Sequence, residues 1–399
     1  MTSDTATQIT SPPEDGAARS PVEPQAVAQR NRELDGIRGW AAMAVIAQHL
    51  IYNTFSSYVP ALEQIPYFLR DGSFAVVVFF VLSGDALSAR FLRDYDVAGV
   101  RKLTLSRYFR LTGMVLLSCL VMYFLLVGGL APHRQAAALI GNTTWFDSAL
   151  DFPASLLDTL GYSLYRVYTE FGWHPQDSYN PFLWTMSVEL LGSALIFGYM
   201  LIYSGLRYKV ATTLVVMVLS ALVSSYAPLF FLGMLIGIAR SRGVLARQAS
   251  KVWWHATAIG LLVFFALYDS YGTPLGEGIK GVFAGLLVWA AGSVPVLQRA
   301  LTSRLSRFLG DISFPLYAFQ FPVMMSFTAL AIVAVGRSGE LTIPWALLIM
   351  LASVVVIVVV ATLAERLERL YLRRLARAID RITLPSAAVS SDHSPRPMP

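Results

Sequence analysis

The chain has 399 residues, of which 55% are hydrophobic and only 14% are charged, with a formal net charge of +6. Soluble domains carry about 25% charged residues, so this chain lacks the side chains needed to cover a water-facing surface. Its basic residues fall between apolar runs, which indicates membrane topology and excludes a nucleic-acid-binding face. The single cysteine, Cys119, excludes an intramolecular disulfide and a multi-cysteine metal site.

The first 30 residues are rich in Pro, Ala, Ser and acidic residues and show no apolar periodicity. We expect them to form a disordered cytoplasmic extension. The N-terminus shows neither the basic region nor the short apolar core of a signal peptide, so we expect the first apolar segment to remain as a span.

Apolar runs of about 17–25 residues, the length that crosses a bilayer, recur from residue 36 onward. We predict an all-α, polytopic transmembrane helix bundle in the cytoplasmic membrane. About ten spans are expected, at residues 36–56, 73–92, 110–130, 183–204, 209–225, 227–240, 253–270, 278–296, 312–335 and 344–364.

The basic residues set the orientation of these spans. With the N-terminus inside, the outer segments contain only Arg70, Arg134, Arg166, Lys280 and Arg337 of the 31 Lys and Arg residues. This asymmetry predicts that both termini are cytoplasmic.

The predicted spans divide the chain into regions. The membrane domain is expected at 31–365, followed by an amphipathic basic helix at 366–385 against anionic lipid and a disordered tail at 386–399. The longest outer connection, 131–182, combines Trp and Tyr with helical apolar spacing, which indicates an interfacial helix or a re-entrant segment.

The segment LDGIRGWAAMAVIAQHL carries Arg38 at its start and His49 eleven residues later. On a helix the two lie about 16 Å apart along the axis. Ionisable side chains are costly inside a membrane, so His49 is a candidate functional residue. A neutral imidazole can take a proton from a hydroxyl, which makes His49 a candidate general base, although a structural role stays open.

Acidic residues in two other spans are further candidates. Glu189 lies at about the same predicted depth as His49 and would orient its imidazole, unless it pairs with another buried polar group. Asp85 needs a partner such as an arginine, and ligand binding or a salt bridge are equally open. Ser83, beside it, is a candidate substrate contact or a small residue of helix packing.

Three arginines gather at the predicted inner surface. Arg107 and Arg110 share one helix face in RYFR, and Arg38 lies on the helix of His49. The excess of basic residues in cytoplasmic segments is enough to explain arginines there. A guanidinium group, however, can also bind a phosphate through two hydrogen bonds. The cluster, with Asp35, is therefore a candidate site for a coenzyme A thioester.

The ninth span opens with LGDISFPLYAFQFPVM, in which two prolines would kink the helix and expose backbone groups to a cavity. Tyr317 and Gln320 point to the same face. They are candidate substrate-binding residues with Trp184, or they bond to neighbouring helices. The sequence holds no recognisable metal-binding motif, so no metal is expected.

Taken in order, LDGIRG with His49, FFVLSG, RYFR, LWTMSVE and ISFPLY resemble the motifs of the acyltransferase 3 family of integral membrane acyltransferases. The resemblance runs from about Glu33 to Val360. It implies about ten spans, an acyl-CoA donor in the cytosol, expected to be acetyl-CoA, and an acceptor hydroxyl on an envelope polysaccharide, a lipid-linked glycan or a small molecule.

The resemblance also assigns residues. Arg38 and His49 match the family's Arg-x10-His motif, which makes His49 the essential catalytic residue. Arg107 and Arg110 match its cytoplasmic Arg-x-x-Arg, and Glu189 ends its Trp-Ser-x-x-Val-Glu-like motif. Two positions depart from the family pattern: Asp85 follows the Ser-Gly pair, and Gln320 replaces a frequent histidine.

The sequence thus predicts a membrane-embedded O-acyltransferase that moves an acyl group from acyl-CoA to a hydroxyl of a carbohydrate or lipid-linked glycan. Direct transfer and an acyl-histidine intermediate both stay open. The alternative is a proton-coupled transporter or flippase of a polar lipid or sugar, with His49, Asp85 and Glu189 as the relay.

Overall fold

The computed structural model describes residues 31–142, 144–271 and 275–383, and every regular element among them is a helix. The predicted all-α class is confirmed. The extensions at 1–30 and 386–399, expected to be disordered, lie outside the described residues. The longer helices are α1 (Arg32–Ile46), α3 (Gly72–Asp94), α4 (Val97–Val127), α9 (Thr185–Tyr203), α10 (Lys209–Ser220), α11 (Ala227–Ser241), α13 (Val252–Tyr271), α14 (Glu277–Ser293), α17 (Ser313–Val323), α18 (Ala329–Ser338) and α19 (Ile343–Thr383).

Shorter helices connect or extend them. These are η1 (Ala47–Asn53), η2 (Pro60–Gln64), α2 (Tyr67–Arg70), α5 (His133–Ile140), α6 (Trp145–Ser148), α7 (Leu156–Gly161), η3 (Tyr162–Arg166), α8 (Val167–Thr169), η4 (Pro181–Trp184), α12 (Val244–Gln248), α15 (Pro295–Leu301), α16 (Arg304–Asp311) and η5 (Met324–Thr328). The long connection 131–182 is thus folded into five of these short helices.

Several long apolar helices make the chain a multi-pass integral membrane protein. Within the described ranges, six helical stretches are long and apolar enough to cross a bilayer, namely α3, α4, η4 with α9, α13, α17 through α18, and α19. The pair α14 and α15, bent by 93°, is a seventh candidate. The expected ten spans and their orientation are therefore not confirmed, because α10 and α11 are short and the first expected span is divided between α1 and η1.

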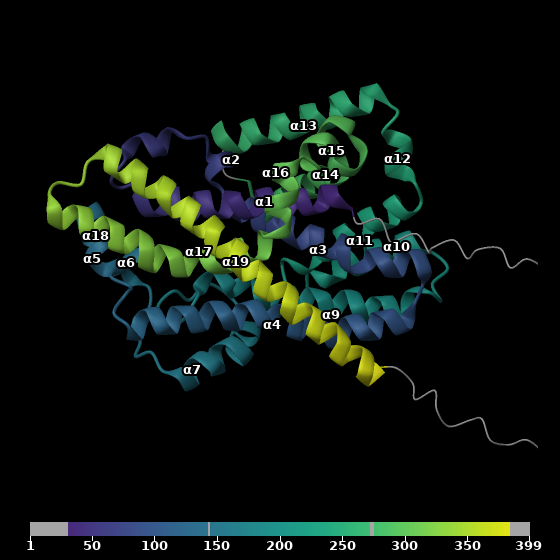
Figure 1. Ribbon diagram of the computed structural model, residues 1–399. Coiled ribbons are helices and arrows are strands. Elements are labelled where there is room, and N and C mark those ends of the chain that lie inside the picture. Colours follow the sequence, from purple (N-terminus) through teal and green to yellow (C-terminus); the bar gives the residue numbers. More distant parts are fainter. Residues whose placement is uncertain (1–30, 143, 272–274, 384–399) are drawn as a thin grey trace, which may run out of the picture. The chain divides into compact units, whose positions relative to one another are not determined.

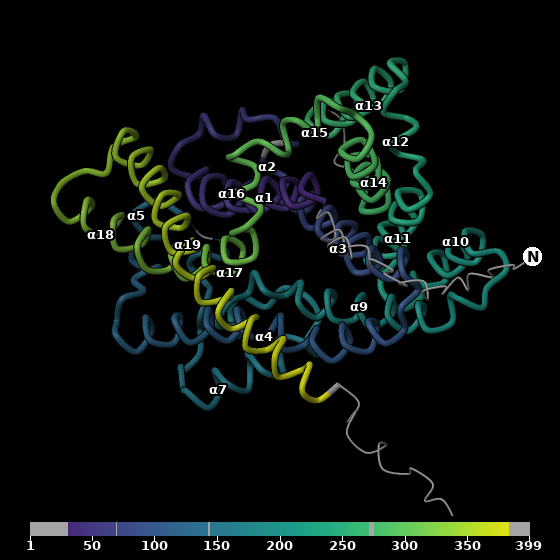
Figure 2. Tube along the Cα trace, turned by 45° about the vertical axis from the view of Figure 1, so that its right-hand side comes forward, coloured from purple at the N-terminus to yellow at the C-terminus, as the bar shows by residue number. Residues whose placement is uncertain are grey.

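The helix α3 is the central element. It packs against α1, α9, α11 and α14, as Figure 2 shows. Figure 1 shows α19 running obliquely across α4, with α9 beside α4. The last expected span and residues 366–383 of the basic amphipathic segment belong to α19, one helix of 41 residues, and residues 384–385 lie outside the described part of the chain.

Two glycines bring α3 and α11 into backbone contact. A Cβ atom on Gly84 would lie 1.9 Å from the carbonyl oxygen of Phe230, and one on Gly233 would lie 2.0 Å from that of Val81. No side chain fits at these distances, so both positions require glycine. The contact holds α3 where Ser83 and Asp85 enter the site described next.

Candidate functional site

His49 lies in η1, a π-helix that continues α1 without a break. A π-turn leaves backbone carbonyls without their α-helical partners, and such turns are frequent at functional sites. Here the carbonyl of His49 accepts a hydrogen bond from Thr54 Oγ1 at 2.8 Å. Asn142 Nδ2 donates to the carbonyls of Asn53 at 2.8 Å and of Thr54 at 2.9 Å, so the end of η1 is fixed to the connection that follows α5.

Three aromatic side chains, Trp145, Trp173 and Phe182, surround the half-buried His49 imidazole and form what we call the aromatic cage. Phe182 stacks on the imidazole with ring centroids 3.9 Å apart, and Trp173 lies parallel to it at 6.1 Å. Trp145 lies perpendicular to it at 5.9 Å. All three rings are uncharged, so the cage surrounds the imidazole with aromatic groups and places no carboxylate on it.

The polar neighbour of His49 is Asn53, whose Nδ2 lies 3.5 Å from the imidazole Nδ1. Asn53 and the cage were not predicted from the sequence. Asn53 follows His49 by one helical turn, and this spacing could have predicted the contact between the two side chains. The cage residues come from η4 and from the connection 131–182, whose Trp content was visible but whose position was not.

The expected contact between Glu189 and His49 is not formed. Glu189 Oε1 accepts hydrogen bonds from Ser83 Oγ at 2.5 Å and from Arg107 Nη2. Arg107 also donates through Nε to Ser193 Oγ at 2.9 Å. The side chains of Arg107 and Glu189 are 17% and 11% exposed, and a carboxylate inside an apolar bundle is stabilised far more by a full positive charge than by a neutral imidazole. Glu189 thus belongs with Arg107 and Ser83.

Asp85 is fully buried and pairs with an arginine, but not with one of the three predicted ones. Its Oδ2 accepts from Arg240 Nη2 at 2.9 Å, and Arg240 Nη1 donates to Glu33 Oε1 at 2.9 Å. Arg240 was not predicted from the sequence, because the excess of basic residues in cytoplasmic segments is enough to explain an arginine at the end of α11. The three side chains connect α1, α3 and α11.

The three predicted donor-binding arginines lie in one region. Arg38 Nη1 lies 4.0 Å from Asp35 Oδ1, one turn earlier in α1. Arg110 is exposed and interacts electrostatically with Arg107, Glu368 and Arg38. The cluster therefore combines the half-buried Arg107, which pairs with Glu189, with the exposed Arg110. Glu368 of α19 is a further member that the sequence did not indicate.

Tyr317 and Gln320 support the cage from α17. The Tyr317 hydroxyl donates to the carbonyl of Phe182 and lies 2.8 Å from Thr185 Oγ1. Gln320 Nε2 donates to the carbonyl of Tyr317 at 3.2 Å, whereas its enclosed Oε1 has no hydrogen-bond partner in the described part of the chain. Tyr317 thus fixes the backbone of the residue that stacks on His49.

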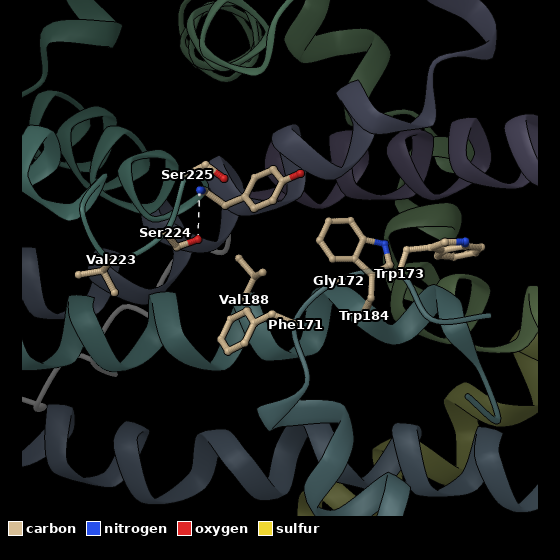
Figure 3. A pocket seen from close by; sticks show the side chains of 9 residues that line it. Phe171, Gly172, Trp173, Trp184, Val188, Val223, Ser224 and Ser225 are labelled. Carbon is tan, nitrogen blue, oxygen red and sulfur yellow. Dashed lines mark hydrogen bonds between the residues drawn. The ribbon is translucent and has the colours of Figure 1, made fainter. Parts of the chain in front are cut away.

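An open cavity of about 630 Å³ adjoins the aromatic cage. Trp173 belongs to both, and Trp184, predicted to bind substrate, also lines the cavity. Figure 3 shows Phe171, Trp173 and Trp184 across the opening from the segment 223–225. The lining residues are uncharged: Phe171, Gly172, Trp173, Trp184, Val188, Val223, Ser224, Ser225 and Tyr226.

Comparison with known proteins identifies the family. The chain matches the model of the acyltransferase domain of acyltransferase 3 proteins over residues 31–362. It is a member of the acyltransferase 3 family. The predicted resemblance is confirmed, and the chain is an acyltransferase. No curated protein and no solved structure shows significant similarity to it.

The acyltransferase 3 match runs from the start of α1 into α19 and includes all of the site residues predicted from the sequence, whereas Glu368 lies beyond it. An acyltransferase needs a place for the acyl donor and a group that activates the acceptor. The arginine cluster at one end of the α1–η1 helix and His49 in its cage at the other end are candidates for these two parts.

Proposed function

We propose that this protein is an acyl-CoA-dependent O-acyltransferase of the cytoplasmic membrane, with acetyl-CoA as donor and a hydroxyl of a carbohydrate or lipid-linked glycan as acceptor. The observation that carries the proposal is one helix with two chemically distinct ends. Arg38 lies among arginines suited to phosphates, and His49 lies in an apolar cage about 16 Å further along.

In this proposal the donor phosphates bind at Arg38 and Arg110, and the acyl end reaches along α1 to His49. Arg107, also predicted to bind the donor, pairs with Glu189 instead, so in this proposal it lines the site and does not contact the phosphates. The charge distribution of the sequence supports ten spans with both termini in the cytoplasm, which places the arginines on the side where acyl-CoA is made.

The transfer begins when the His49 imidazole takes the proton of the acceptor hydroxyl, while the hydroxyl oxygen attacks the thioester carbonyl carbon. The tetrahedral intermediate loses the CoA thiolate as its C–S bond breaks, and the imidazolium returns its proton to the thiolate. An ester and free CoA result. In the second route, an imidazole nitrogen attacks the thioester carbonyl carbon, the C–S bond breaks and the CoA thiolate leaves. The acceptor hydroxyl oxygen then attacks the acyl-histidine, the C–N bond breaks to restore the imidazole, and the hydroxyl proton passes to the thiolate.

The proton relay that the transporter alternative requires is not formed. His49, Asp85 and Glu189 belong to three separate hydrogen-bond groups, with Asn53, Arg240 and Arg107 as the respective partners. Since the chain also belongs to an acyltransferase family, we retain the transferase as the one proposed function.

The test measures free CoA release and acceptor acylation by the purified protein in nanodiscs with acetyl-CoA. His49→Ala should lower kcat by about 10²–10⁴-fold, the range of general acid–base catalysis, and leave acetyl-CoA binding intact. His255→Ala, which changes a histidine of α13 that bonds to the carbonyl of Ala249, is the matched control and should keep full activity. Undiminished turnover in His49→Ala would refute the assignment of His49.

A further inference from the structure

Trp145 has an indole N–H group without a partner in the described part of the chain. Its Nε1 atom is enclosed by protein and forms no hydrogen bond with any described residue. Three other tryptophans bond through Nε1 to side-chain oxygens: Trp40 to Ser306 at 3.0 Å, Trp254 to Ser293 at 2.9 Å and Trp289 to Gln248 at 2.5 Å. An enclosed donor without an acceptor is costly and calls for a physical reason.

The unpartnered group lies beside the candidate catalytic histidine. The Trp145 ring lies 5.9 Å from the His49 imidazole at an interplanar angle of 81°, and 5.3 Å from the Phe182 ring at 65°. The rings of Phe146 and Phe321 pack against it at 5.8 Å and 6.3 Å. Neighbours of this kind hold the indole in place but offer its N–H no oxygen acceptor.

A polar clamp fixes the start of α6 against η1. Asn142 Nδ2 donates to the carbonyls of Asn53 and Thr54, which end the π-helix of His49. Asn142 Oδ1 accepts from the backbone N–H and the hydroxyl of Thr144, the residue before Trp145. One buried amide therefore sets the position of Trp145 relative to His49.

We propose that Trp145 is a catalytic residue whose indole N–H donates a hydrogen bond to the carbonyl oxygen of the acyl group during transfer. This inference rests on the proposed function and names the group that stabilises its charged intermediate. As the acceptor oxygen attacks the carbonyl carbon, the C=O bond opens and negative charge collects on its oxygen. A fixed donor in apolar surroundings stabilises that charge strongly, because no water competes for it.

The same chemistry explains why the donor has no partner among the described residues. An acceptor from the protein would occupy the N–H and would have to be displaced before each turnover. The indole keeps its proton throughout the reaction, so the proton balance between acceptor hydroxyl, His49 and CoA thiolate is unchanged. In the acyl-histidine route, the same N–H binds the same carbonyl oxygen.

The experiment compares Trp145→Phe with the wild-type protein in the CoA release and acylation assays. Phe keeps an aromatic ring in the cage and removes only the N–H and part of the ring area. We expect kcat to fall by about 10²–10³-fold, the effect of removing one oxyanion donor, with the KM for acetyl-CoA changed less than threefold. Trp253→Phe, at a 63% exposed position of α13, is the matched control.

Thermal unfolding separates this role from a structural one. Loss of an unpaired buried donor removes a cost of the folded state, so Trp145→Phe should melt within about 2 °C of the wild type or above it. Substitution of residue 145 by 3-benzothienylalanine, which keeps the bicyclic shape and replaces N–H by sulfur, should give the same loss of kcat even if the Phe variant folds poorly.

Wild-type kcat in either substituted protein would overturn the proposal and leave the N–H as a donor to the face of the Phe182 ring. A fall in activity matched by an equal loss of folded protein would overturn it as well. An inactive His49→Ala beside a fully active Trp145→Phe refutes only the role of Trp145, whereas an active His49→Ala refutes the proposed function.

Discussion

Arg107 and Glu189 neutralise each other inside the helix bundle, and Ser83 and Ser193 complete the hydrogen bonds of the pair. Removing one partner of a buried ion pair leaves the other charge without compensation, which is costly. Arg110, one turn further along α4, is exposed, so two arginines of the same RYFR segment have different tasks.

A double-mutant cycle measures this difference. Arg107→Gln and Glu189→Gln should each destabilise the protein by about 3–5 kcal/mol, and the double variant should lose clearly less than the sum of the two. Unfolding in detergent gives the free energies. Strictly additive losses would show that the two charges are not coupled.

Arg110→Gln is the matched variant within the same segment. It should leave the unfolding free energy within about 0.5 kcal/mol of the wild type, because exposed substitutions away from caps and packing seldom exceed that. We expect its effect in the KM for acetyl-CoA, which should rise about tenfold with the loss of one charge-assisted phosphate contact. An unchanged KM would remove Arg110 from the donor site.

Individual candidate residues were visible in the sequence because ionisable groups stand out in apolar runs. Their partners were not, since Glu189 and Arg107 lie 82 residues apart and only the packing of α4 on α9 brings them together. Arg38, Arg107 and Arg110 lie in one region as predicted, although Arg107 and Arg110 lie near the middle of α4 and not at its end. The cage around His49 depends on how the connection 131–182 folds, which no periodicity specifies.

At the scale of elements, the contact between α3 and α11 depends on the missing side chains of Gly84 and Gly233. A Cβ at Gly233 would also lie 2.7 Å from the backbone nitrogen of Asp85. Backbone atoms cannot move aside as side chains do, so any substitution there separates the helices.

Gly233→Ala should therefore destabilise the protein by at least about 1–3 kcal/mol, the usual cost of overpacking, and should weaken the ion pair of Asp85 with Arg240. Gly198→Ala in α9 is the control, because a Cβ there meets nothing within 4 Å. Its higher helix propensity should stabilise α9 by up to about 1 kcal/mol. Equal melting temperatures for the two variants would contradict the close contact.

Element positions were mostly predictable from apolar runs, and helices occupy each of the ten expected places. Two features were not. The π-helix η1 differs from an α-helix by local backbone hydrogen bonds that no residue pattern of AQHLIYN demands. Pro295 indicates a break between α14 and α15, but the 93° direction of the bend there depends on packing, which the sequence does not show.

At the scale of the molecule, α19 is longer than any bilayer requires. Its 41 residues span about 60 Å, whereas the hydrocarbon core is about 30 Å thick. The basic half remains attached to α4, since Tyr371 donates to the carbonyl of Phe109 at 2.7 Å and Lys102 pairs with Asp380 at 3.0 Å. Both helices are therefore long enough to extend together beyond an apolar layer of that thickness.

Labelling of single cysteines tests the ten-span arrangement, and the sole native cysteine makes it practicable. In a Cys119→Ala background, a cysteine at exposed Asp177 should react with an impermeant maleimide from outside, and one at exposed Ser250 only after the membrane is opened. Ser225→Cys, between α10 and α11, is decisive. Reaction from outside means that both short helices cross, and reaction only after opening means that neither does.

The glycine contact has a mechanical consequence. With the carbonyls of Val81 and Phe230 seated on the backbone of the opposite helix, α3 and α11 cannot slide or rotate past each other without atomic overlap. The two helices therefore move as one rigid body. Ser83, Asp85 and Arg240 are carried by that body, so the ion pair of Asp85 with Arg240 and the hydroxyl that Ser83 donates to Glu189 move together or not at all.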